Sequence, residues 1–227
     1  MGSYVSLRLP SRGLYAITDD NREEPEVLSQ RVAQAIEGGA VLVQYRDKSR
    51  SYDSRLHMAK SLRRVCRAMA VPFIVNDDLE LAVAVDADGL HLGEDDVDYQ
   101  RAREALGPQR IIGVSCYNSL PKALSVQALG ADYVAFGSLF SSTTKPNASR
   151  ASLTTIREAR KRITIPIAAI GGLTPENSVP VIEAGVDFLA VISGVFAHKD
   201  LQSAARRYAD LFASCHCKES QDSMKPK

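Results

Sequence analysis

The stretch that decides the fold is LGADYVAF, residues 129–136, in which a glycine closes a helical pattern and an aspartate precedes an apolar run. Similar junctions occur at EGGAVLV (37–43), DADGLHL (86–92) and EAGVDFLAV (183–191), each with glycine or a small residue, often followed by aspartate. Glycine at such a position lets a helix end in the left-handed conformation before the chain enters a sheet. The recurrence indicates that one helix-to-strand unit is used repeatedly along the chain.

Eight apolar runs have the character of strands, and amphipathic helical patterns separate them. The runs cover residues 13–18, 41–47, 72–77, 89–94, 111–116, 133–140, 166–172 and 188–194. Nearly continuous apolar runs are typical of parallel strands covered by helices. Eight such units within about 200 residues close most economically into a single (β/α)8 TIM barrel with parallel strands, an α/β fold. A doubly wound open sheet is the alternative, although it usually has fewer strands.

The length of 227 residues fits one domain with short extensions. We expect an N-terminal extension at residues 1–12, a barrel catalytic domain at 13–213 and a disordered C-terminal tail at 214–227, which is polar and aperiodic. The tail contains a Cys-His-Cys stretch at 215–217. Because this spacing lacks the second ligand pair of a zinc site, we expect no metal there.

The composition excludes several classes of protein. With 28 Lys and Arg residues against 27 Asp and Glu, the formal net charge is +1, which gives no reason to expect nucleic acid or an anionic membrane as a partner. No apolar run approaches the roughly 20 residues that span a bilayer, and the first residues lack the apolar segment of a signal peptide. We therefore expect a soluble cytoplasmic protein, and the sequence leaves open whether it forms a homo-oligomer.

A barrel of this kind has its active site at the carboxyl ends of the strands, so polar residues there are the candidates for function. Gln44, Arg46 and Lys48 end the second run and alternate along the chain, which puts their side chains on one face. An internal ion pair with a neighbouring carboxylate is one explanation of the two cations, since burying an unpaired charge is costly. An anionic ligand accounts for both cations better.

Acidic residues follow the next two runs, in NDD at 76–78 and EDD at 94–96. Carboxylates in such loops usually stay solvated or cap the following helix, and either role explains Asp78 and Asp95. Asp77 and Asp96, facing the cations of the second strand, fit a Mg²⁺–diphosphate site better because Mg²⁺ prefers oxygen ligands. His91 lies between two leucines and is explained as a core histidine at least as well as by catalysis.

Polar groups and glycines also end the remaining runs: Ser115, Cys116 and Asn118, then the hydroxyl-rich LFSSTTK at 139–145, then Gly171 and Gly172, and finally Ser193 and Gly194. Glycines with exposed N–H groups after the last two strands match the usual phosphate position in barrels. Cys116 has no evident histidine partner, and neither a G-x-S-x-G turn nor a P-loop occurs. The residues predict a barrel enzyme that acts on phosphorylated small molecules with a divalent cation, without naming the reaction.

Seven ordered stretches carry a resemblance to a known family: QYRDK (44–48), VNDD (75–78), ADGLHLGEDD (87–96), GVSCYN (113–118), ADYVAFGSLFSSTTK (131–145), PIAAIGGL (166–173) and AGVDFLAVIS (184–193). On these stretches the chain resembles the thiamine-phosphate synthase family over residues 13–213. The resemblance implies a transferase of thiamine biosynthesis. Such an enzyme joins 4-amino-2-methyl-5-hydroxymethylpyrimidine diphosphate to a thiazole phosphate and releases diphosphate, through a dissociative step with a pyrimidine-stabilised carbocation.

The resemblance also implies roles for individual residues. Gln44, Arg46, Lys48, Asn76, Ser115 and Lys145 would bind the pyrimidine diphosphate; Asp77 and Asp96 would hold Mg²⁺; Ser142, Thr143, Thr144, Gly172, Ile192 and Ser193 would bind the thiazole phosphate. The catalytic residues among them would be Arg46, Lys48, Ser115 and Lys145.

The chain departs from the family pattern mainly in its hydroxyl-rich loop. Ser138 and Ser141 replace prolines, and Ser142 replaces a threonine while keeping a hydroxyl. We expect the phosphate contact to be retained and the loop to be looser, because proline restricts the backbone. Tyr117 stands where the family often has histidine, which affects contacts to the substrate ring rather than the reaction.

Two other functions compete with the synthase. The related thiazole tautomerase has a histidine in the place of Ser115, so Ser115 and the complete polar set of the second strand favour the synthase. A non-catalytic barrel that binds a phosphorylated ligand is the other alternative. Such a protein has little need of a metal site, so the presence of both Asp77 and Asp96 argues against it.

Overall fold

Eight parallel strands close into a ring in which β8 pairs with β1. They are β1 (Gly13–Ile17), β2 (Ala40–Tyr45), β3 (Phe73–Asn76), β4 (Gly89–Leu92), β5 (Ile111–Tyr117), β6 (Tyr133–Phe136), β7 (Ile167–Ile170) and β8 (Phe188–Val191). The computed structural model describes residues 7–19, 23–93, 96, 98–141 and 151–222, with side chains as far as residue 214. The predicted (β/α)8 barrel is confirmed.

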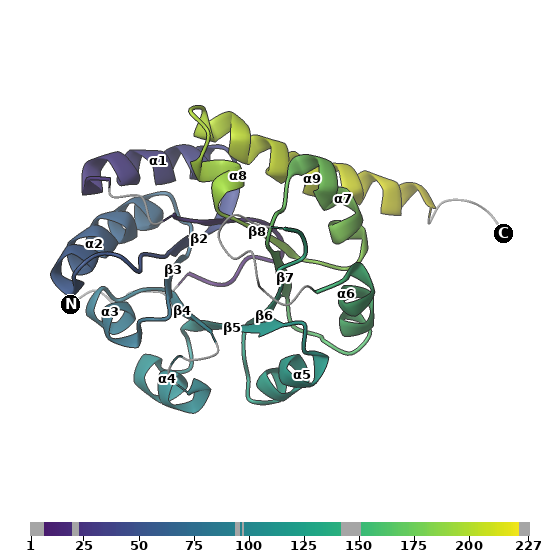
Figure 1. Ribbon diagram of the computed structural model, residues 1–227, viewed down its shortest axis with the longest axis horizontal. Coiled ribbons are helices and arrows are strands. Elements are labelled where there is room, and N and C mark those ends of the chain that lie inside the picture. Colours follow the sequence, from purple (N-terminus) through teal and green to yellow (C-terminus); the bar gives the residue numbers. More distant parts are fainter. Residues whose placement is uncertain (1–6, 20–22, 94–95, 97, 142–150, 223–227) are drawn as a thin grey trace.

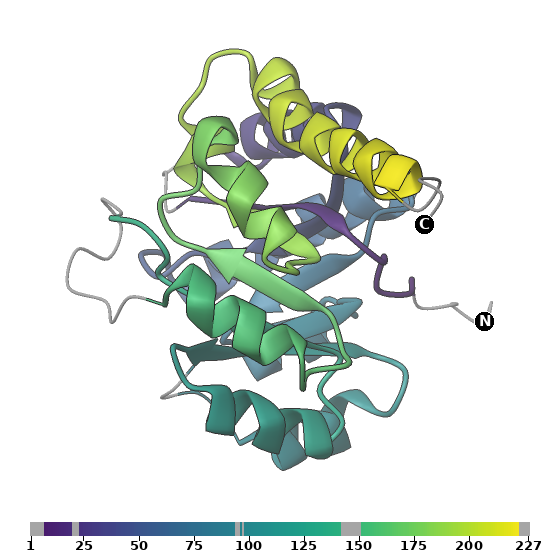
Figure 2. The same ribbon diagram turned by 90° about the vertical axis from the view of Figure 1, so that its right-hand side faces the viewer.

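Helices surround the ring of strands (Figure 1). They are α1 (Pro25–Glu37), α2 (Tyr52–Ala68), α3 (Leu79–Ala84), α4 (Tyr99–Leu106), α5 (Leu120–Ala128), α6 (Leu153–Arg160), α7 (Pro175–Glu183), α8 (Ser193–Phe196) and α9 (Leu201–Asp222). The last helix packs against α1 and α7 (Figures 1 and 2). It continues past residue 213, where we expected the barrel to end, and the domain boundaries themselves stay a prediction. Within the described part of the chain, no helix combines the length and the apolar character that a membrane span needs.

Several strands end earlier than the apolar runs that predicted them. β6 ends at Phe136 and β7 at Ile170, whereas the runs continued to residues 140 and 172. Gly171 and Gly172 have φ angles of 101° and 63°, which L side chains rarely adopt, so the chain leaves the sheet there. After β8 the chain forms the short helix α8 in place of further strand. The chain therefore turns out of the barrel directly above these strands.

Side chains fill the interior of the ring, so the barrel is a packed core and not a pore. Tyr15, Tyr133 and Phe188 meet edge to face there, with ring centroids between 5.9 and 6.4 Å apart. This geometry is one that aromatic pairs prefer. A second apolar layer, which includes Leu62 and Ile156, lies between the strands and the helices.

Aspartates of three of the repeated junctions connect elements at the amino end of the barrel. Each accepts a hydrogen bond from a backbone N–H at the start of the preceding strand and pairs with an arginine of the helix before that strand. The sets are Asp88 with Phe73 N–H (2.9 Å) and Arg63, Asp132 with Ile112 N–H (2.8 Å) and Arg103, and Asp187 with Ile167 N–H (2.8 Å) and Arg160. The repetition in the sequence thus corresponds to a repeated structural connection.

Candidate active site

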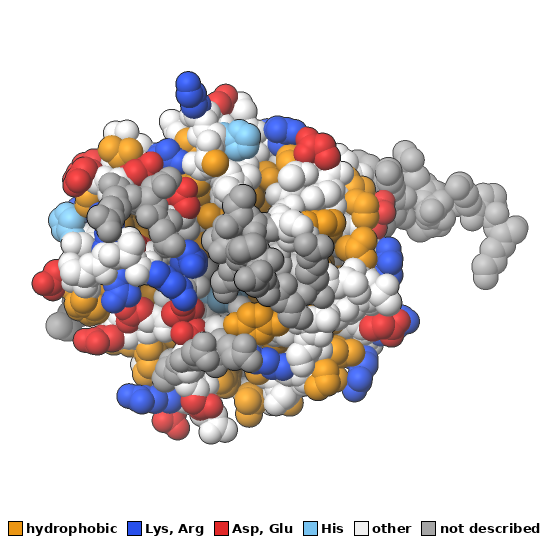
Figure 3. Space-filling model, in the orientation of Figure 1, with side chains coloured by type: hydrophobic (Ala, Val, Ile, Leu, Met, Phe, Trp, Pro, Cys, Tyr) orange, Lys and Arg blue, Asp and Glu red, His pale blue; other side chains and the backbone are white. Residues whose placement is uncertain are grey.

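A cavity of about 280 Å³ opens at the carboxyl ends of the strands. Every strand contributes to its lining, through residues of the strand itself or of the segment that follows: Tyr15 and Ile17 from β1; Gln44, Arg46 and Lys48 from β2 and its loop; Asn76 and Asp77 from β3 and its loop; His91, Gly93 and Asp96 from β4 and its loop; Ser115 and Tyr117 from β5; Ala135, Gly137 and Ser138 from β6 and its loop; Ala168 and residues 170–173 from β7 and its loop; Ala190 and residues 192–194 from β8 and the segment after it. Figure 3 shows basic and acidic side chains next to one another on this face, to the left of its centre.

The structure brings most of the predicted site residues together. Those that line the one cavity are Gln44, Arg46, Lys48, Asn76, Asp77, Asp96, Ser115, Gly172, Ile192 and Ser193. The remaining predicted residues are Ser142, Thr143, Thr144 and Lys145, which lie outside the described residues. The expectation of a site at the carboxyl ends of the strands therefore agrees with where the described residues converge.

The end of β2 is fixed by its neighbour β1. Gln44 is buried, with 2% of its surface exposed, although it lines the cavity. The Arg46 N–H donates to the Thr18 hydroxyl oxygen at 3.0 Å, and that hydroxyl donates to the Arg46 carbonyl at 3.2 Å. Thr18 is fully buried, so the backbone at Arg46 is held in place by a rigid partner.

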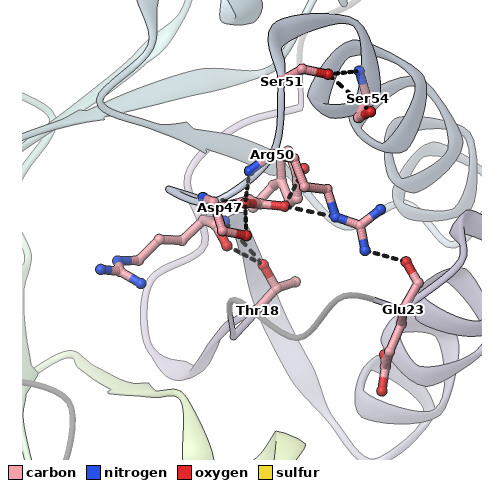
Figure 4. A network of polar contacts seen from close by, with 9 residues as sticks. Thr18, Glu23, Asp47, Arg50, Ser51 and Ser54 are labelled. Atoms are coloured by element: carbon pink, nitrogen blue, oxygen red, sulfur yellow. Dashed lines mark hydrogen bonds and ion pairs between the residues drawn. The ribbon is translucent and has the colours of Figure 1, made fainter.

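The loop after β2 is organised around Asp47 (Figure 4), which is not among the residues that line the cavity. One carboxylate oxygen accepts from the N–H groups of Ser49 at 2.8 Å and Arg50 at 3.1 Å, and the other pairs with the Arg50 Nε at 3.1 Å. The Arg50 guanidinium continues to the backbone carbonyl of Glu23 before α1. The Asp47 side chain is only 4% exposed, so this network holds the loop that bears the two cations of the site.

An acidic pair faces one of these cations. The Asp77 carboxylate lies 2.8 Å from Lys48 Nζ and is hydrogen-bonded to Asp96, whose carboxylate also accepts from the Gly93 N–H. Asp77 has a φ of 63°, a conformation that is strained for a residue other than glycine and is often found at functional sites. The neighbouring Asp78 instead caps α3 by accepting from the Leu81 N–H at 2.9 Å, as expected for an aspartate outside the site.

The two carboxyls of this pair differ in their affinity for a proton. Burial opposes ionisation of Asp77, but the hydrogen bond from Asp96 and the hydrogen bond and charge of Lys48 outweigh it, so the pKa of Asp77 lies below its ordinary value. Burial, followed by the hydrogen bond to Asp77, raises the pKa of Asp96. The pKa values of the two carboxyls are thus displaced in opposite directions, as expected for two carboxylates held side by side.

His91 combines the two interpretations that its sequence left open. It is 8% exposed and lines the cavity, and its two ring nitrogens bond to the hydroxyls of Tyr133 and Ser115, each at 2.9 Å. The Tyr133 hydroxyl also bonds to that of Tyr15 at 2.8 Å. Sequence reasoning missed both tyrosines. The sequence feature that could have indicated them is a tyrosine within an otherwise apolar strand, because a buried tyrosine hydroxyl needs a hydrogen-bond partner.

Glycines after β7 let the loop that follows β6 approach closely. A Cβ on Gly171 would lie 2.0 Å from the Ser138 hydroxyl oxygen, and one on Gly172 would lie 2.5 Å from the Ser141 carbonyl. The Phe140 N–H donates to the Gly171 carbonyl at 3.0 Å, and the Ser138 hydroxyl donates to the Phe140 carbonyl at 2.7 Å. The Ser138 hydroxyl thus closes a local turn.

Cys116 takes no part in the cavity. Its side chain is buried in the outer core, and burial raises the pKa of its thiol to about 12. A thiol of this kind is inert, because the thiolate is the nucleophile. The structure is consistent with the expectation that catalysis does not use this cysteine.

Comparison with known proteins decides the family. The family profile described as thiamine monophosphate synthase matches residues 14–195. The chain belongs to this family. It is similar to the thiamine-phosphate synthase of Nitrosococcus oceani, at 50% identity over 203 residues that cover 89% of this chain and 94% of the relative. The corresponding protein of Aromatoleum aromaticum is 50% identical over 201 residues, covering 88% of this chain and 96% of the relative.

A solved structure agrees with these relatives. The thiamine phosphate pyrophosphorylase from Pyrococcus furiosus matches with a TM-score of 0.81 at 36% identity, covering 90% of this chain and 96% of that chain. The resemblance to the thiamine-phosphate synthase family is therefore confirmed by sequence and by fold.

Proposed function

We propose that the protein catalyses the thiamine-phosphate synthase reaction, in which the pyrimidine substrate loses diphosphate and the ring nitrogen of the thiazole phosphate takes its place. One observation carries the proposal. A single cavity joins a wall of cations and carboxylates at β2–β4 to a glycine-rich wall at β7 and β8. Because the strands follow one another in order around a closed ring, these two walls face each other. Such a cavity suits two anionic substrates, one at each wall.

At the first wall, Arg46, Lys48 and Asn76 bind the diphosphate of the pyrimidine substrate. Their positions support this role, because all three line the cavity beside the acidic pair. Cations held in place before the reaction stabilise the charge that develops on a leaving diphosphate. Lys145 joins them in the proposal as a further catalytic cation, on the strength of the family resemblance.

Asp77 and Asp96 form the part of this wall that suits Mg²⁺. Their two carboxylates already converge closely enough to share a hydrogen bond, and oxygen ligands of this kind are those that Mg²⁺ prefers. Among the described residues no cluster of three or more His, Cys, Asp or Glu side chains converges as a metal site, so substrate oxygens would complete the coordination. Bound there, Mg²⁺ would supply charge neutralisation for the diphosphate.

At the opposite wall, the thiazole phosphate binds to backbone groups and hydroxyls. The proposed ligands are Gly172, Ile192 and Ser193, together with Ser142, Thr143 and Thr144 of the loop after β6. Support comes from the glycine conformations after β7 and from residues 192–194, which line the cavity at the usual phosphate position of barrels.

The pyrimidine ring lies between the walls, where Gln44 and Ser115 supply hydrogen bonds. Both line the cavity above the buried aromatic layer of Tyr15 and Tyr133. A packed aromatic floor of this kind keeps water from a carbocation, and fixed polar groups hold the ring in line with the incoming thiazole nitrogen. We also infer that the enzyme works in the cytoplasm, because the charged precursors cross a bilayer poorly.

The direct test is to incubate the purified protein with both precursors and Mg²⁺ and to measure thiamine phosphate and diphosphate. We expect equal amounts of the two products. Formation of neither would refute the proposed reaction. Isomerisation of the thiazole alone, without consumption of the pyrimidine, would assign the protein to the tautomerase reaction instead.

A further inference from the structure

A continuous chain of hydrogen bonds crosses the floor of the cavity. It runs through Gln44, Tyr15, Tyr133, His91 and Ser115, with successive distances of 2.5, 2.8, 2.9 and 2.9 Å. Both ends of the chain line the cavity, whereas Tyr133 in its middle is fully buried and does not. The two polar groups proposed to bind the pyrimidine are therefore connected to each other through side chains below the site.

The direction of donation along these hydrogen bonds follows from the first residue, Gln44. Gln44 engages Tyr15 through its amide nitrogen, which can only donate, so the Tyr15 hydroxyl accepts there and donates onward to Tyr133. Tyr133 in turn donates to Nδ1 of His91. A neutral imidazole that accepts at Nδ1 carries its proton on Nε2, so His91 donates to the Ser115 oxygen. The Ser115 proton is then left to point into the cavity.

Both phenols keep their protons, as this direction requires. Burial raises the pKa of Tyr15 and of Tyr133 well above the ordinary value for tyrosine. A cationic His91 would leave one hydroxyl proton of these five residues without an acceptor among them. With both ring nitrogens donating, Tyr133 would donate to Tyr15, which also accepts from Gln44, and the Tyr15 proton would have no acceptor within the chain.

Gly113 makes the central contact of the chain possible. In the sheet register it lies between His91 on β4 and Tyr133 on β6. A Cβ at this position would lie 1.9 Å from Cζ of the Tyr133 ring, so the tyrosine occupies the space that any other residue would fill. The Tyr133 and His91 rings consequently stack across β5, with centroids 5.6 Å apart and an interplanar angle of 24°.

We propose that Tyr133 is a positioning residue that sets the direction of this chain, so that Ser115 presents a proton and Gln44 keeps its carbonyl oxygen turned toward the substrate. The proposal rests on the proposed function for the identity of the ligand. An aminopyrimidine offers the matching pattern, with a ring nitrogen that accepts and an amino group that donates. An analogue with a carbonyl in place of the amino group inverts the pattern, so the chain selects against it.

The test combines two measurements on the variant Tyr133→Phe, which removes the central hydroxyl and keeps the ring. NMR of the histidine ring nitrogens reports which nitrogen of His91 carries the proton, and a His91→Gln variant identifies its signals. Titration with the amino and oxo pyrimidine alcohols, which lack diphosphate and cannot react, reports the preference for the amino compound. The matched control is Tyr99→Phe, because Tyr99 is a buried tyrosine of α4 whose hydroxyl bonds to Arg103.

For the wild type we expect the Nε2–H tautomer and a preference for the amino alcohol. In Tyr133→Phe the tautomers should mix and the preference should fall about tenfold, as the loss of one hydrogen bond at the site allows. Tyr99→Phe should change neither. Tyr15→Phe breaks the chain one step earlier, so it should keep the Nε2–H tautomer but reduce the preference, because the Gln44 amide can then turn.

An Nδ1–H or doubly protonated His91 in the wild type would overturn the proposal. So would an unchanged tautomer and preference in folded Tyr133→Phe. If that variant does not fold, an unchanged preference in Tyr15→Phe would overturn it equally. Neither measurement depends on turnover. A wild type with the expected tautomer that makes no thiamine phosphate would therefore refute the proposed reaction and leave the direction of the chain standing.

Discussion

The two ends of the barrel use aspartate in opposite ways. At the amino end, Asp88 is 1% exposed and accepts from a backbone N–H while it pairs with Arg63. At the carboxyl end, Asp77 and Asp96 lie against each other beside Lys48. The first arrangement satisfies a carboxylate with fixed partners, and the second brings like charges together.

This difference separates stability from function. A buried carboxylate with a complete set of partners holds its neighbours in place, and removing it exposes the cost of the charges left behind. Two carboxylates held against each other are unfavourable in the free protein, and a bound cation relieves their repulsion. Substitutions at the two ends should therefore affect different measurements: turnover at the carboxyl end and the free energy of unfolding at the amino end.

The largest effect is expected at the carboxyl end. Asp77→Ala should lower turnover about a thousandfold, as is typical when a group that stabilises developing charge is removed. The free energy of unfolding should stay unchanged or rise, because the strained acidic pair is relieved. Steady-state kinetics and denaturant unfolding measure the two quantities. Lys145→Ala should give a similar loss of turnover with the fold intact, and normal activity in either variant would contradict the assigned roles.

The reverse is expected for Asp88→Ala at the amino end. The substitution leaves the Arg63 cation and the Phe73 N–H without their buried partner, so the free energy of unfolding should fall by about 3 kcal/mol. Turnover per folded molecule should equal that of the wild type, measured at a temperature where the variant is folded. A large loss of turnover with normal stability would remove the distinction between the two ends.

The architecture was predictable from the sequence because it depends on local patterns. The apolar runs and the glycine junctions predicted eight strands, and all eight occur in the ring. The same patterns predicted strands that are too long, because apolar residues such as Leu139 and Ile192 continue beyond the last residue of the strand. Helix α8 was missed since it has only four residues and a single residue, Ile192, separates it from β8.

The site was predictable only in part, for a physical reason. Strand ends identify residues such as Arg46 and Asp77 because a barrel brings all strand ends to one face. No local sequence pattern indicates a side-chain hydrogen bond between distant strands. Tyr15 and Tyr133, for example, are 118 positions apart in the sequence. The partner of Arg46, Thr18, was likewise visible only once β1 and β2 were paired.

The other two junction aspartates should show a graded effect. Asp187 and Asp132 make the same two kinds of contact as Asp88, but their side chains are 30% and 37% exposed, so water replaces part of each contact. Alanine at either position should lower the free energy of unfolding by about 1 kcal/mol. Denaturant unfolding should therefore show a clearly larger loss in the free energy of unfolding for Asp88→Ala than for the other two variants. Equal losses in all three would show that burial does not determine the size of the loss.

A smaller effect is expected for the loop that holds the cations. Asp47→Ala removes the contacts of the Asp47 carboxylate shown in Figure 4, so Arg46 and Lys48 should lose positional order. We expect KM for the pyrimidine diphosphate to rise about threefold, with a smaller change in kcat, as the loss of a partly exposed network allows. The control is Asp53→Ala, an exposed carboxylate in the first turn of α2. Equal KM values in the two variants would show that Asp47 does not position the cations.

The rate of thiamine phosphate formation in wild type, Asp77→Ala and Asp88→Ala tests most directly whether function resides at the carboxyl end of the barrel. The rates are measured with both precursors and Mg²⁺ at a temperature where all three proteins are folded. We predict product from the wild type and from Asp88→Ala at equal rates per folded molecule, and almost none from Asp77→Ala. No product from the wild type, or wild-type turnover in Asp77→Ala, would contradict the assignment of function to the carboxyl end.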